Sequence, residues 1–410
     1  MSQFIPRPYQ EDAIRLGIDH MLHGKGNAYE VLPTGSGKSI VIAGVADKLD
    51  GPVLVFQPSK EILEQNYWKM RSFGHLPAIF SASAGKKQIA HITFGMIGSV
   101  INRKESFEHF KHIIVDECHL FNPSFDGQYS TFMRHVAEKN GIAPRVLGVT
   151  ATPYRLGSNS FGSQIRMLHR MKPKVWSKML YHVQISELRK MGFLANMEYW
   201  RTRGIDVNLL KFNTNGSEYT EASVKAAWAA SEMTAKVVDV VARLLKVRKN
   251  ALVFVPSVAE AEAVASFMPE AEWVSGETPK AERERIIGGF RQGRIKCVVN
   301  CGVLTTGFDY PELDTVVLAR PTRSLSLFCQ MTGRAMRPHP SKETGWVIDM
   351  AGLVNTFGYM EDLTIGTDKK GLDCIYGSIP RKDAEPYIKQ LTNVNIEPKV
   401  QRSFGYANFR

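Results

Sequence analysis

One stretch of the chain has the residue types and spacing to bind a phosphate group. Residues 31–39 read Val-Leu-Pro-Thr-Gly-Ser-Gly-Lys-Ser. Gly35 and Gly37 allow the backbone to curl so that its N–H groups point at phosphate oxygens. Lys38 can reach the β- and γ-phosphates of a nucleotide, and the Ser39 hydroxyl can ligate Mg²⁺. The stretch therefore predicts a loop that binds a nucleoside triphosphate.

The surroundings of this loop strengthen the interpretation. The usual pattern G-x-x-x-x-G-K-[ST] has its first glycine where this chain has Leu32, and Gly-Lys-Ser alone also occurs in ordinary surface turns. However, residues 28–32 suit a strand, and the apolar residues 40–46 suit a buried helix that begins near Lys38. A helix N-terminus directed at an anion supports phosphate binding. The strand–loop–helix context favours a nucleotide-binding loop over a plain turn.

A second stretch could supply the chemistry of hydrolysis. Within residues 113–119, the apolar residues 113–115 are followed directly by Asp116 and Glu117. Ligands of parallel sheets bind beyond the carboxyl ends of the strands, where these two carboxylates are expected to lie. We expect Asp116 to hold Mg²⁺, directly or through water, and Glu117 to polarise the attacking water as a general base. A solvated Asp-Glu turn is the alternative, and the nearby phosphate loop makes it the weaker one.

The composition is compatible with these ligands. The chain has 410 residues, which suits two domains, and a net charge of +12 from 52 basic and 40 acidic residues. This excess favours a polyanionic partner such as nucleic acid, although it could equally serve solubility alone. No secretory signal and no run long enough to cross a membrane is visible, so we expect no membrane partner and a cytoplasmic location. The five irregularly spaced cysteines favour a reducing compartment.

Short apolar runs alternate with stretches that could be helices. Such runs suit strands buried on both faces of a parallel sheet, and their alternation with helices predicts a doubly wound α/β fold. They occupy residues 53–56, 91–94, 113–116 and 146–149 in the first part, and 251–255, 296–300, 315–319 and 346–348 in the second. Four runs in each part predict two similar sheets in tandem. Residues 224–247 predict one long amphipathic helix between the two sets.

At this point the chain resembles superfamily 2 helicases. Residues 115–119, Val-Asp-Glu-Cys-His, look like motif II in its Asp-Glu-Cys-His variant, and residues 330–337 match the Q-x-x-G-R-x-x-R of motif VI. The other motifs follow in order at residues 7–10, 34–39, 57–60, 93–99, 150–153, 254–257 and 305–309. Within the superfamily the likeness is nearest to RadD-like bacterial proteins, judged by residues 7–10, 147–157 and 303–309. Those relatives carry a cysteine-rich C-terminal region, which this chain lacks.

The resemblance implies two tandem RecA-like domains with ATP in a cleft between them. It divides the chain into an ATP-binding domain (1–160), a linker with accessory elements (161–235), a second helicase domain (236–350) and a C-terminal extension (351–410). The residues that it implies for catalysis are Lys38, Glu117, Arg334 and Arg337, with both arginines acting on the γ-phosphate. For ATP it implies Arg7, Gln10, Pro33, Thr34, Gly35, Ser36, Gly37, Lys38, Ser39, Gly307 and Asp309, and for Mg²⁺ it implies Ser39 and Asp116.

Nucleic-acid contacts and their coupling to ATP are implied in the same way. The backbone contacts are expected at Lys60, Gly95, Ser99, Ser257, Thr305 and Thr306, because small polar groups bind phosphates without reading bases. The coupling residues are His119, Thr150, Thr152 and Gln330. DNA is favoured over RNA only through the RadD likeness, a bacterial or phage-infected cell is the suspected source, and a monomer is expected. Zinc is not expected, since Cys297 and Cys301 lack further ligands nearby.

Several functions remain open on the sequence. The chain could separate strands as a helicase, translocate on duplex DNA without unwinding it, serve as the motor of a larger complex, or act on RNA. A protein of another class, an ATP-gated nucleic-acid clamp, would not need the water activator Glu117. Tyr67, Trp68 and Met70 are expected to pack a helix rather than to stack on bases.

Overall fold

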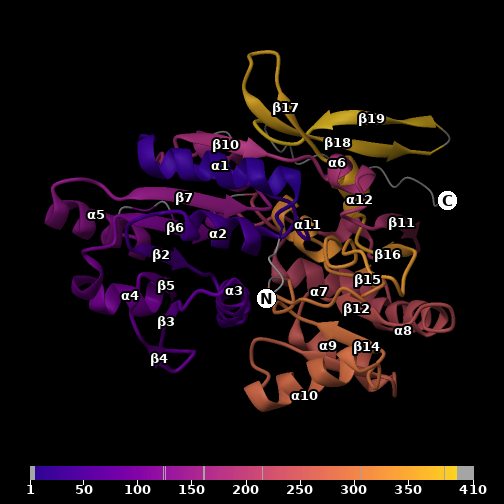
Figure 1. The fold of residues 1–410 in the computed structure, drawn as a ribbon. Helices are drawn as coiled ribbons and strands as arrows, with labels where there is room; N and C mark the ends of the chain where they lie inside the picture. The colour runs from indigo at the N-terminus through magenta and orange to yellow at the C-terminus, as the bar shows by residue number, and fades with distance from the viewer. Residues whose placement is uncertain are drawn as a thin grey trace. The chain divides into compact units, whose positions relative to one another are not determined.

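The chain folds into two compact units, and each has its own parallel sheet (Figure 1). The computed structural model describes residues 5–122, 124, 126–159, 162–214, 216–305, 307–382 and 384–394, with only the backbone at 158, 159, 162 and 163. The first unit runs to Arg155 and includes Arg166–Val183. The second unit comprises Leu156–Ile165 and the chain from Gln184 onward.

The first unit is built on an eight-stranded sheet of order β10-β1-β7-β6-β2-β5-β3-β4. All neighbouring strands are parallel except β3 and β4. The strands are β1 (Ala28–Val31), β2 (Val53–Phe56), β3 (Ala78–Ser81), β4 (Lys86–Lys87), β5 (Ile92–Gly95), β6 (His112–Asp116), β7 (Arg145–Thr150) and β10 (Lys178–His182). The α-helices are α1 (Pro8–His23), α2 (Lys38–Asp47), α3 (Lys60–Ser72), α4 (Ile97–Val100) and α5 (Gln128–Asn140).

The order of the strands places the sequence motifs at one edge of this sheet. Val31 pairs with Thr150 between β1 and β7, and Asp116 pairs with Val149 between β6 and β7. The strands β1, β7 and β6 therefore end side by side, and each is followed directly by a motif. Because all three are parallel, their C-terminal ends form the edge at which α/β sheets bind ligands.

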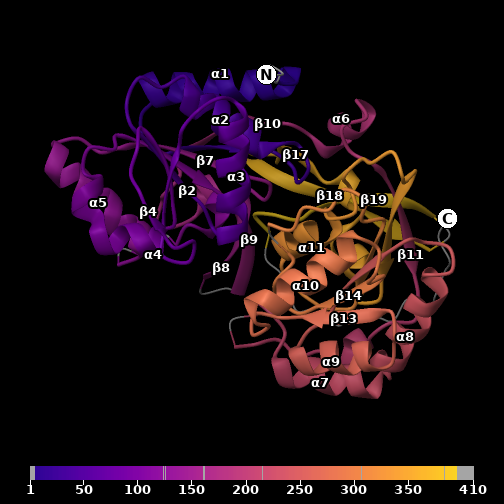
Figure 2. The same cartoon turned by 60° about the horizontal axis from the view of Figure 1, so that its bottom comes forward.

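The second unit contains a six-stranded parallel sheet of order β11-β16-β15-β12-β14-β13. Its strands are β11 (Asn196–Arg201), β12 (Ala251–Phe254), β13 (Ala271–Val274), β14 (Cys297–Asn300), β15 (Thr315–Leu318) and β16 (Thr344–Asp349). The helices of the unit are α6 (Ile185–Lys190), α7 (Glu221–Ala230), α8 (Met233–Leu244), α9 (Val258–Ser266), α10 (Lys280–Arg291), α11 (Leu325–Thr332) and α12 (Leu353–Phe357). Both α9 and α10 pack on β13 and β14 (Figure 2).

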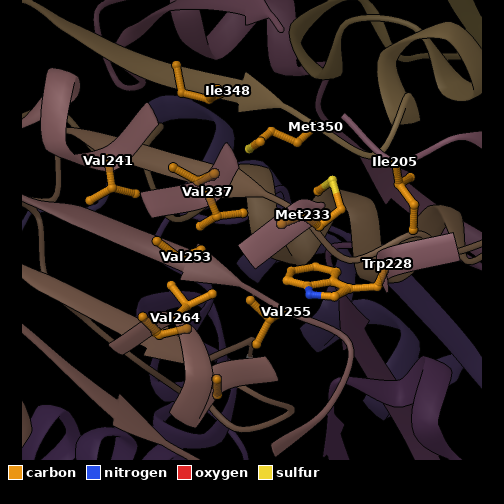
Figure 3. Packing of buried hydrophobic residues seen from close by; sticks show 14 of the residues in the cluster. Ile205, Trp228, Met233, Val237, Val241, Val253, Val255, Val264, Ile348 and Met350 are labelled. Atoms are coloured by element: carbon orange, nitrogen blue, oxygen red, sulfur yellow. The ribbon is translucent and has the colours of Figure 1, made fainter. Parts of the chain in front are cut away.

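A continuous apolar core holds α7 and α8 on the second sheet. Trp228 and Met233 pack with Val237, Val253 and Met350 in this core (Figure 3). The two helices are separate, so the prediction of one helix over residues 224–247 is wrong. The break lies at Glu232, whose φ of 51° is left-handed and cannot continue an α-helix.

Two smaller sheets complete the structure. Strands β17 (Thr364–Thr367), β18 (Asp373–Arg381) and β19 (Ala384–Gln390) form an antiparallel sheet in the second unit, and β8 (Tyr154–Asn159) pairs with β9 (Gly162–Met167). The sequence did not predict either sheet. The doubly wound α/β class with two parallel sheets is confirmed, and all eight predicted runs overlap strands. Along the described ranges, no helix is both long and apolar enough for a bilayer.

Candidate active site

The loop before α2 has the conformation that phosphate binding requires. Gly35 and Gly37 adopt φ values of 86° and 82°, which favour glycine. A Cβ atom on Gly37 would lie 2.6 Å from Nε2 of Gln10, so a larger residue would also collide with that amide. Helix α2 begins at Lys38, as predicted, and directs the N–H groups of its first turn toward the loop. Pro33, Thr34, Ser36 and Ser39 complete this segment, and Thr34 and Ser36 are buried.

A chain of polar contacts links this loop to the ends of β6 and β7. Nζ of Lys38 lies 3.2 Å from Oε1 of Glu117, and Nδ1 of His119 lies 3.3 Å from Oε2 of the same carboxylate. The His119 Nδ1 atom is also 2.8 Å from Oγ1 of Thr150. The Thr150 carbonyl accepts from the Leu32 N–H at 2.8 Å, and its hydroxyl accepts from the Thr152 N–H at 3.0 Å. Five sequence-predicted residues are therefore brought together within the first unit.

The neighbouring carboxylate Asp116 is buried and held by an amide. Oδ2 of Asp116 accepts from Nδ2 of Asn66 at 3.0 Å, and Oδ1 accepts from the Glu117 N–H at 2.9 Å. Nδ2 of Asn66 also donates to Oε1 of Gln57 at 3.0 Å. Burial and the charge of Glu117 raise the pKa of Asp116 to about 7. A divalent cation would compensate this unfavourable negative charge, so the carboxylate of Asp116 suits Mg²⁺. Ligation of Mg²⁺ by Asp116 and Ser39 together stays a prediction.

The electrostatics of Glu117 differ from those of Asp116. Burial alone would raise the pKa of Glu117, but the Lys38 ammonium and His119 lower it below the ordinary value. Glu117 therefore stays ionised, as a general base must be before it accepts a proton. Its backbone is left-handed, with φ 46° and ψ 50°. This conformation turns the chain sharply at the end of β6, so the two adjacent carboxylates face different partners.

The segment at residues 7–10 is bound to the phosphate loop in this structure. Nε2 of Gln10 donates to the Ser36 carbonyl at 2.7 Å, and Oε1 of Gln10 accepts from the Arg7 N–H at 2.9 Å. The Tyr9 hydroxyl donates to the same Ser36 carbonyl at 2.5 Å. Gln10 is buried and both ends of its amide are engaged, so here it positions the loop. Recognition of adenine by Arg7 and Gln10 remains a prediction.

The predicted arginines of the second unit are bound to the loop that contains Gly307 and Asp309. Arg334 donates to the carbonyls of Thr305 and Phe308, both at 2.6 Å, and to that of Gln330 at 3.3 Å. Arg337 donates to the Phe308 carbonyl at 3.1 Å and forms an ion pair with Asp309. Gly307 has φ 71°, a left-handed value that allows the loop to turn. Motifs V and VI thus form one hydrogen-bonded assembly.

Four of the predicted nucleic-acid contacts lie at or near the starts of helices. In the first unit, Lys60 is the first residue of α3, Ser99 lies in α4, and Gly95 ends β5 in a buried position. In the second unit, Ser257 caps α9 by accepting from the Glu260 N–H at 3.4 Å. Thr305 offers its carbonyl to Arg334, and Thr306 lies outside the described residues. Nucleic-acid binding at these positions stays a prediction.

Two residues of the site were missed by sequence reasoning. Tyr9 stands next to Gln10 in the motif at residues 7–10, which reads Arg-Pro-Tyr-Gln, so that motif contained the signal for it. Asn66 lies in the middle of α3 and has no motif around it. Only the tertiary structure, in which α3 packs against α2, β3 and β5, brings Asn66 to Asp116 at the end of β6. All five cysteines are free, and no cluster of three or more metal-binding side chains occurs among the residues described.

Comparison with known proteins agrees with this arrangement. The family model "Type III restriction enzyme, res subunit" matches residues 3–155, and "Helicase conserved C-terminal domain" matches residues 235–339. The two matches cover the two sets of motifs in the expected order. The chain belongs to helicase superfamily 2. This assignment confirms the predicted superfamily, whereas the nearer likeness to RadD remains a prediction.

Two curated relatives and one solved structure illustrate the extent of the likeness to known proteins. A "51.5 kDa protein" of Lactococcus phage (isolate 7-9) is 30% identical over 326 residues, which are 77% of this chain and 64% of the relative. The "ATP-dependent DNA helicase uvsW" of enterobacteria phage T4 is 25% identical over 373 residues, 85% of this chain and 69% of the relative. A fragment described as an HsdR subunit of a type I restriction enzyme, from Vibrio vulnificus YJ016, superposes with a TM-score of 0.65 at 21% identity, over 90% of this chain and 70% of that fragment.

Three curated relatives, among them the Lactococcus phage protein, are longer than the region that matches this chain. This superfamily 2 chain spans about half to two thirds of their length. The solved structure shares the fold at low sequence identity, so it supports the architecture and not a particular substrate.

Proposed function

We propose that this chain is a Mg²⁺-dependent ATPase, stimulated by nucleic acid, that acts as a helicase or translocase on DNA. The observation that carries the proposal is the contact chain from Lys38 through Glu117 and His119 to Thr150, beside a glycine loop at a helix N-terminus. A purely structural site would not need an ionised, buried carboxylate next to a phosphate-binding lysine. The superfamily assignment supports the same reaction, hydrolysis of ATP to ADP and phosphate.

Each residue of the site has a role in this proposal. The loop N–H groups and Lys38 bind the β- and γ-phosphates, and Lys38 shares or releases its contact with Glu117 when the triphosphate enters. Glu117 accepts a proton from the water that attacks the γ-phosphorus. Mg²⁺, when bound by Asp116 and Ser39, would neutralise phosphate charge. We assign Arg337, supported by Arg334, to the charge that develops on the γ-phosphate.

Coupling to nucleic acid is assigned to His119, Thr150, Thr152 and Gln330. His119 contacts both the general base and Thr150, whose carbonyl is bound to the phosphate loop. A displacement of Thr150 or Thr152 would therefore be transmitted to Glu117 through the His119 side chain. Contacts with the nucleic-acid strand are assigned to Lys60, Gly95, Ser99, Ser257, Thr305 and Thr306.

The finer assignments are also proposals. DNA is preferred to RNA because relatives such as the phage T4 protein are named DNA helicases, and the suspected RadD likeness agrees with that choice. We propose residues 1–160 and 236–350 as the two motor domains, with 161–235 and 351–410 as accessory segments. A monomer without zinc, active in the cytoplasm of a bacterial or phage-infected cell, completes the assignment, and the phage relatives support that setting.

The ATPase activity tests the proposal most directly. ATP hydrolysis should be measured alone and with single-stranded DNA, duplex DNA, forks and RNA. The expected result is stimulation by DNA, and a fall in kcat of about 10²-fold or more in Glu117→Gln with nucleotide binding retained. Glu138→Gln, a change of one carboxylate in α5, is the matched control. Vigorous turnover by Glu117→Gln would remove Glu117 from its assigned role.

A second measurement separates a helicase from a duplex translocase. A helicase displaces one strand of a fork, whereas a duplex translocase displaces the third strand of a triplex without melting the duplex. An ATP-gated clamp would bind DNA in the presence of ATP yet show negligible turnover. Fork displacement, triplex displacement and ATP turnover, measured on one protein preparation, therefore distinguish the helicase, the duplex translocase and the clamp.

A further inference from the structure

An exposed aromatic side chain lies on α3 of the first unit. Trp68 is 62% exposed, and its ring lies edge-on to that of Tyr67 with centroids 5.3 Å apart. The prediction that Trp68 packs a helix is therefore wrong, whereas Met70 is fully buried as expected. An indole has a large apolar surface, and leaving it in water has a free-energy cost unless it serves a contact.

Two lysines lie beside this aromatic pair. Lys86 and Lys87 form the exposed strand β4, and Nζ of Lys86 lies 5.4 Å from the centroid of the Tyr67 ring. Within the described part of the chain, neither lysine forms an ion pair with a carboxylate. The four residues Tyr67, Trp68, Lys86 and Lys87, here named the Trp68 patch, thus combine stacking surface with unneutralised positive charge.

The β3–β4 hairpin, which carries Lys86 and Lys87 of the Trp68 patch, is bound to a segment already predicted to contact nucleic acid. The Ala82 N–H, in the turn between β3 and β4, donates to Oγ of Ser99 at 2.9 Å. Ser81 and Ser83 of the same turn each donate to Sδ of Met96 at 3.2 Å. These bonds fix the β3–β4 hairpin against the start of α4.

Helix α3 connects the patch to the other predicted contact. Lys60 and Tyr67 are seven residues apart, which is about two turns, so both lie on one face of the helix roughly 10 Å apart. Glu64, the carboxylate between them on that face, is paired with Lys60 at 3.6 Å. The bonds of the hairpin and the face of α3 therefore connect the Trp68 patch to both Ser99 and Lys60.

We propose that the Trp68 patch binds an unpaired nucleic-acid strand, with the Trp68 indole stacked on a base and Lys86 and Lys87 at phosphates. This inference rests on the proposed function and extends the predicted contacts beyond Lys60 and Ser99. The chemistry fits, since aromatic stacking tolerates any base and lysine bonds phosphate as a point charge. An unpaired strand is the partner because bases inside a duplex do not expose their faces to an indole.

Binding of fluorescent oligonucleotides to the full chain tests the proposal. Trp68→Ala should raise the Kd for a single-stranded oligonucleotide by about 5- to 50-fold and change the Kd for a duplex by less than about twofold. Phe267→Ala removes a similarly exposed ring (69%) in the second unit and should leave both values unchanged. ATP hydrolysis without nucleic acid should not change in either variant. An equal loss for single strand and duplex, or no loss, would overturn the proposal.

Charge and fluorescence give two independent readouts. The double variant Lys86→Gln with Lys87→Gln should reduce the slope of log Kobs against log salt for a single strand by about 1.4, because each phosphate contact contributes about 0.7. The control Lys225→Gln with Lys246→Gln removes the same charge elsewhere and should leave the slope unchanged. Quenching of tryptophan fluorescence by the oligonucleotide should be largely lost in Trp68→Phe. An unchanged salt slope in the double lysine variant would contradict nucleic-acid binding by the Trp68 patch. Unchanged quenching in Trp68→Phe would contradict it as well.

The outcomes also separate this inference from the proposed function. If wild-type protein neither binds nucleic acid nor is stimulated by it, the proposed function fails. If wild-type protein is stimulated while Trp68→Ala binds a single strand as tightly as wild type does, only the Trp68 patch fails.

Discussion

The cationic side chains of the two candidate site regions differ in how many hydrogen-bond acceptors already bind them. In the first unit, Lys38 pairs with the single carboxylate of Glu117, so its ammonium keeps donors for a phosphate. In the second unit, Arg334 donates to three backbone carbonyls, and Arg337 is bound to a carbonyl and to Asp309. A nucleotide can therefore approach the first set with little rearrangement. The second set has to exchange existing hydrogen bonds before it can act on a ligand.

The largest effect is expected at the phosphate loop. Lys38→Ala should lower kcat/KM for ATP by about 10³-fold or more, because the loop loses the charge that neutralises the triphosphate. Steady-state hydrolysis and nucleotide binding check this expectation. Lys48→Ala, at the end of the same helix, removes an exposed lysine paired with Asp47 and should leave both values near wild type. Residual activity above about a tenth of wild type in Lys38→Ala would show that the loop acts without its lysine.

Substitution of Arg337 should affect mainly the rate of hydrolysis, and substitution of Arg334 mainly the stability of the fold. Arg337→Lys should lower kcat by about 10²-fold with little change in ATP affinity, since a transition-state contact is lost and the charge is kept. Arg334→Lys should lower the melting temperature more than Arg337→Lys does, because Arg334 is buried and holds three carbonyls that lysine cannot reach together. Hydrolysis and thermal unfolding of both variants test the division. Equal melting temperatures would mean that Arg334 is not the structural member of the pair.

The coupling chain of the first unit should have an intermediate effect. His119→Ala removes the side chain that contacts both Glu117 and Thr150. We expect basal ATP hydrolysis within about fivefold of wild type and stimulation by DNA reduced about tenfold, since the general base remains while its link is lost. His23→Ala, an exposed histidine at the end of α1, is the control. Stimulation that survives in His119→Ala would place the coupling elsewhere.

The smallest effect concerns a buried carboxyl group of the second unit. Burial raises the pKa of Glu361 to about 7, although Tyr199 donates a hydrogen bond to it at 2.5 Å. The ordinary value is 4.5, so the folded state binds the proton more tightly than the unfolded state does. The resulting stabilisation is complete below about pH 4.5 and is lost as the pH rises through 7, with a limit of about 3 kcal/mol.

Glu361→Gln tests this pH dependence. The difference in free energy of unfolding between wild type and Glu361→Gln should favour wild type at pH 5 and shrink toward pH 8. Denaturant unfolding at several pH values measures the difference. Glu385→Gln, a change of one exposed carboxylate in β19, is the matched control for the loss of a carboxyl group. A flat difference for Glu361→Gln would show that Glu361 is ionised throughout.

Much of the architecture follows from local sequence patterns. The buried runs of four or five apolar residues identified eight strands, and glycine, lysine and carboxylate spacing located the phosphate loop and the end of β6. These features are short in sequence, so the residues that form them are neighbours in the chain. The break between α7 and α8 at Glu232 was not predicted, because the apolar periodicity continues across it and only the backbone conformation reveals it.

The contacts between motifs depend on tertiary structure. Strand order places β1, β7 and β6 next to one another. This order brings Lys38, Glu117 and Thr150 together, although residues 38 and 150 are 112 positions apart in the chain. The sequence established that a lysine, two carboxylates and two arginines were present and correctly spaced. Packing decided that Gln10 binds the loop, that Arg334 binds its own domain's carbonyls and that Trp68 faces solvent. Spacing along a chain fixes which groups can meet on one element, whereas burial and hydrogen bonding between elements fix which of them do.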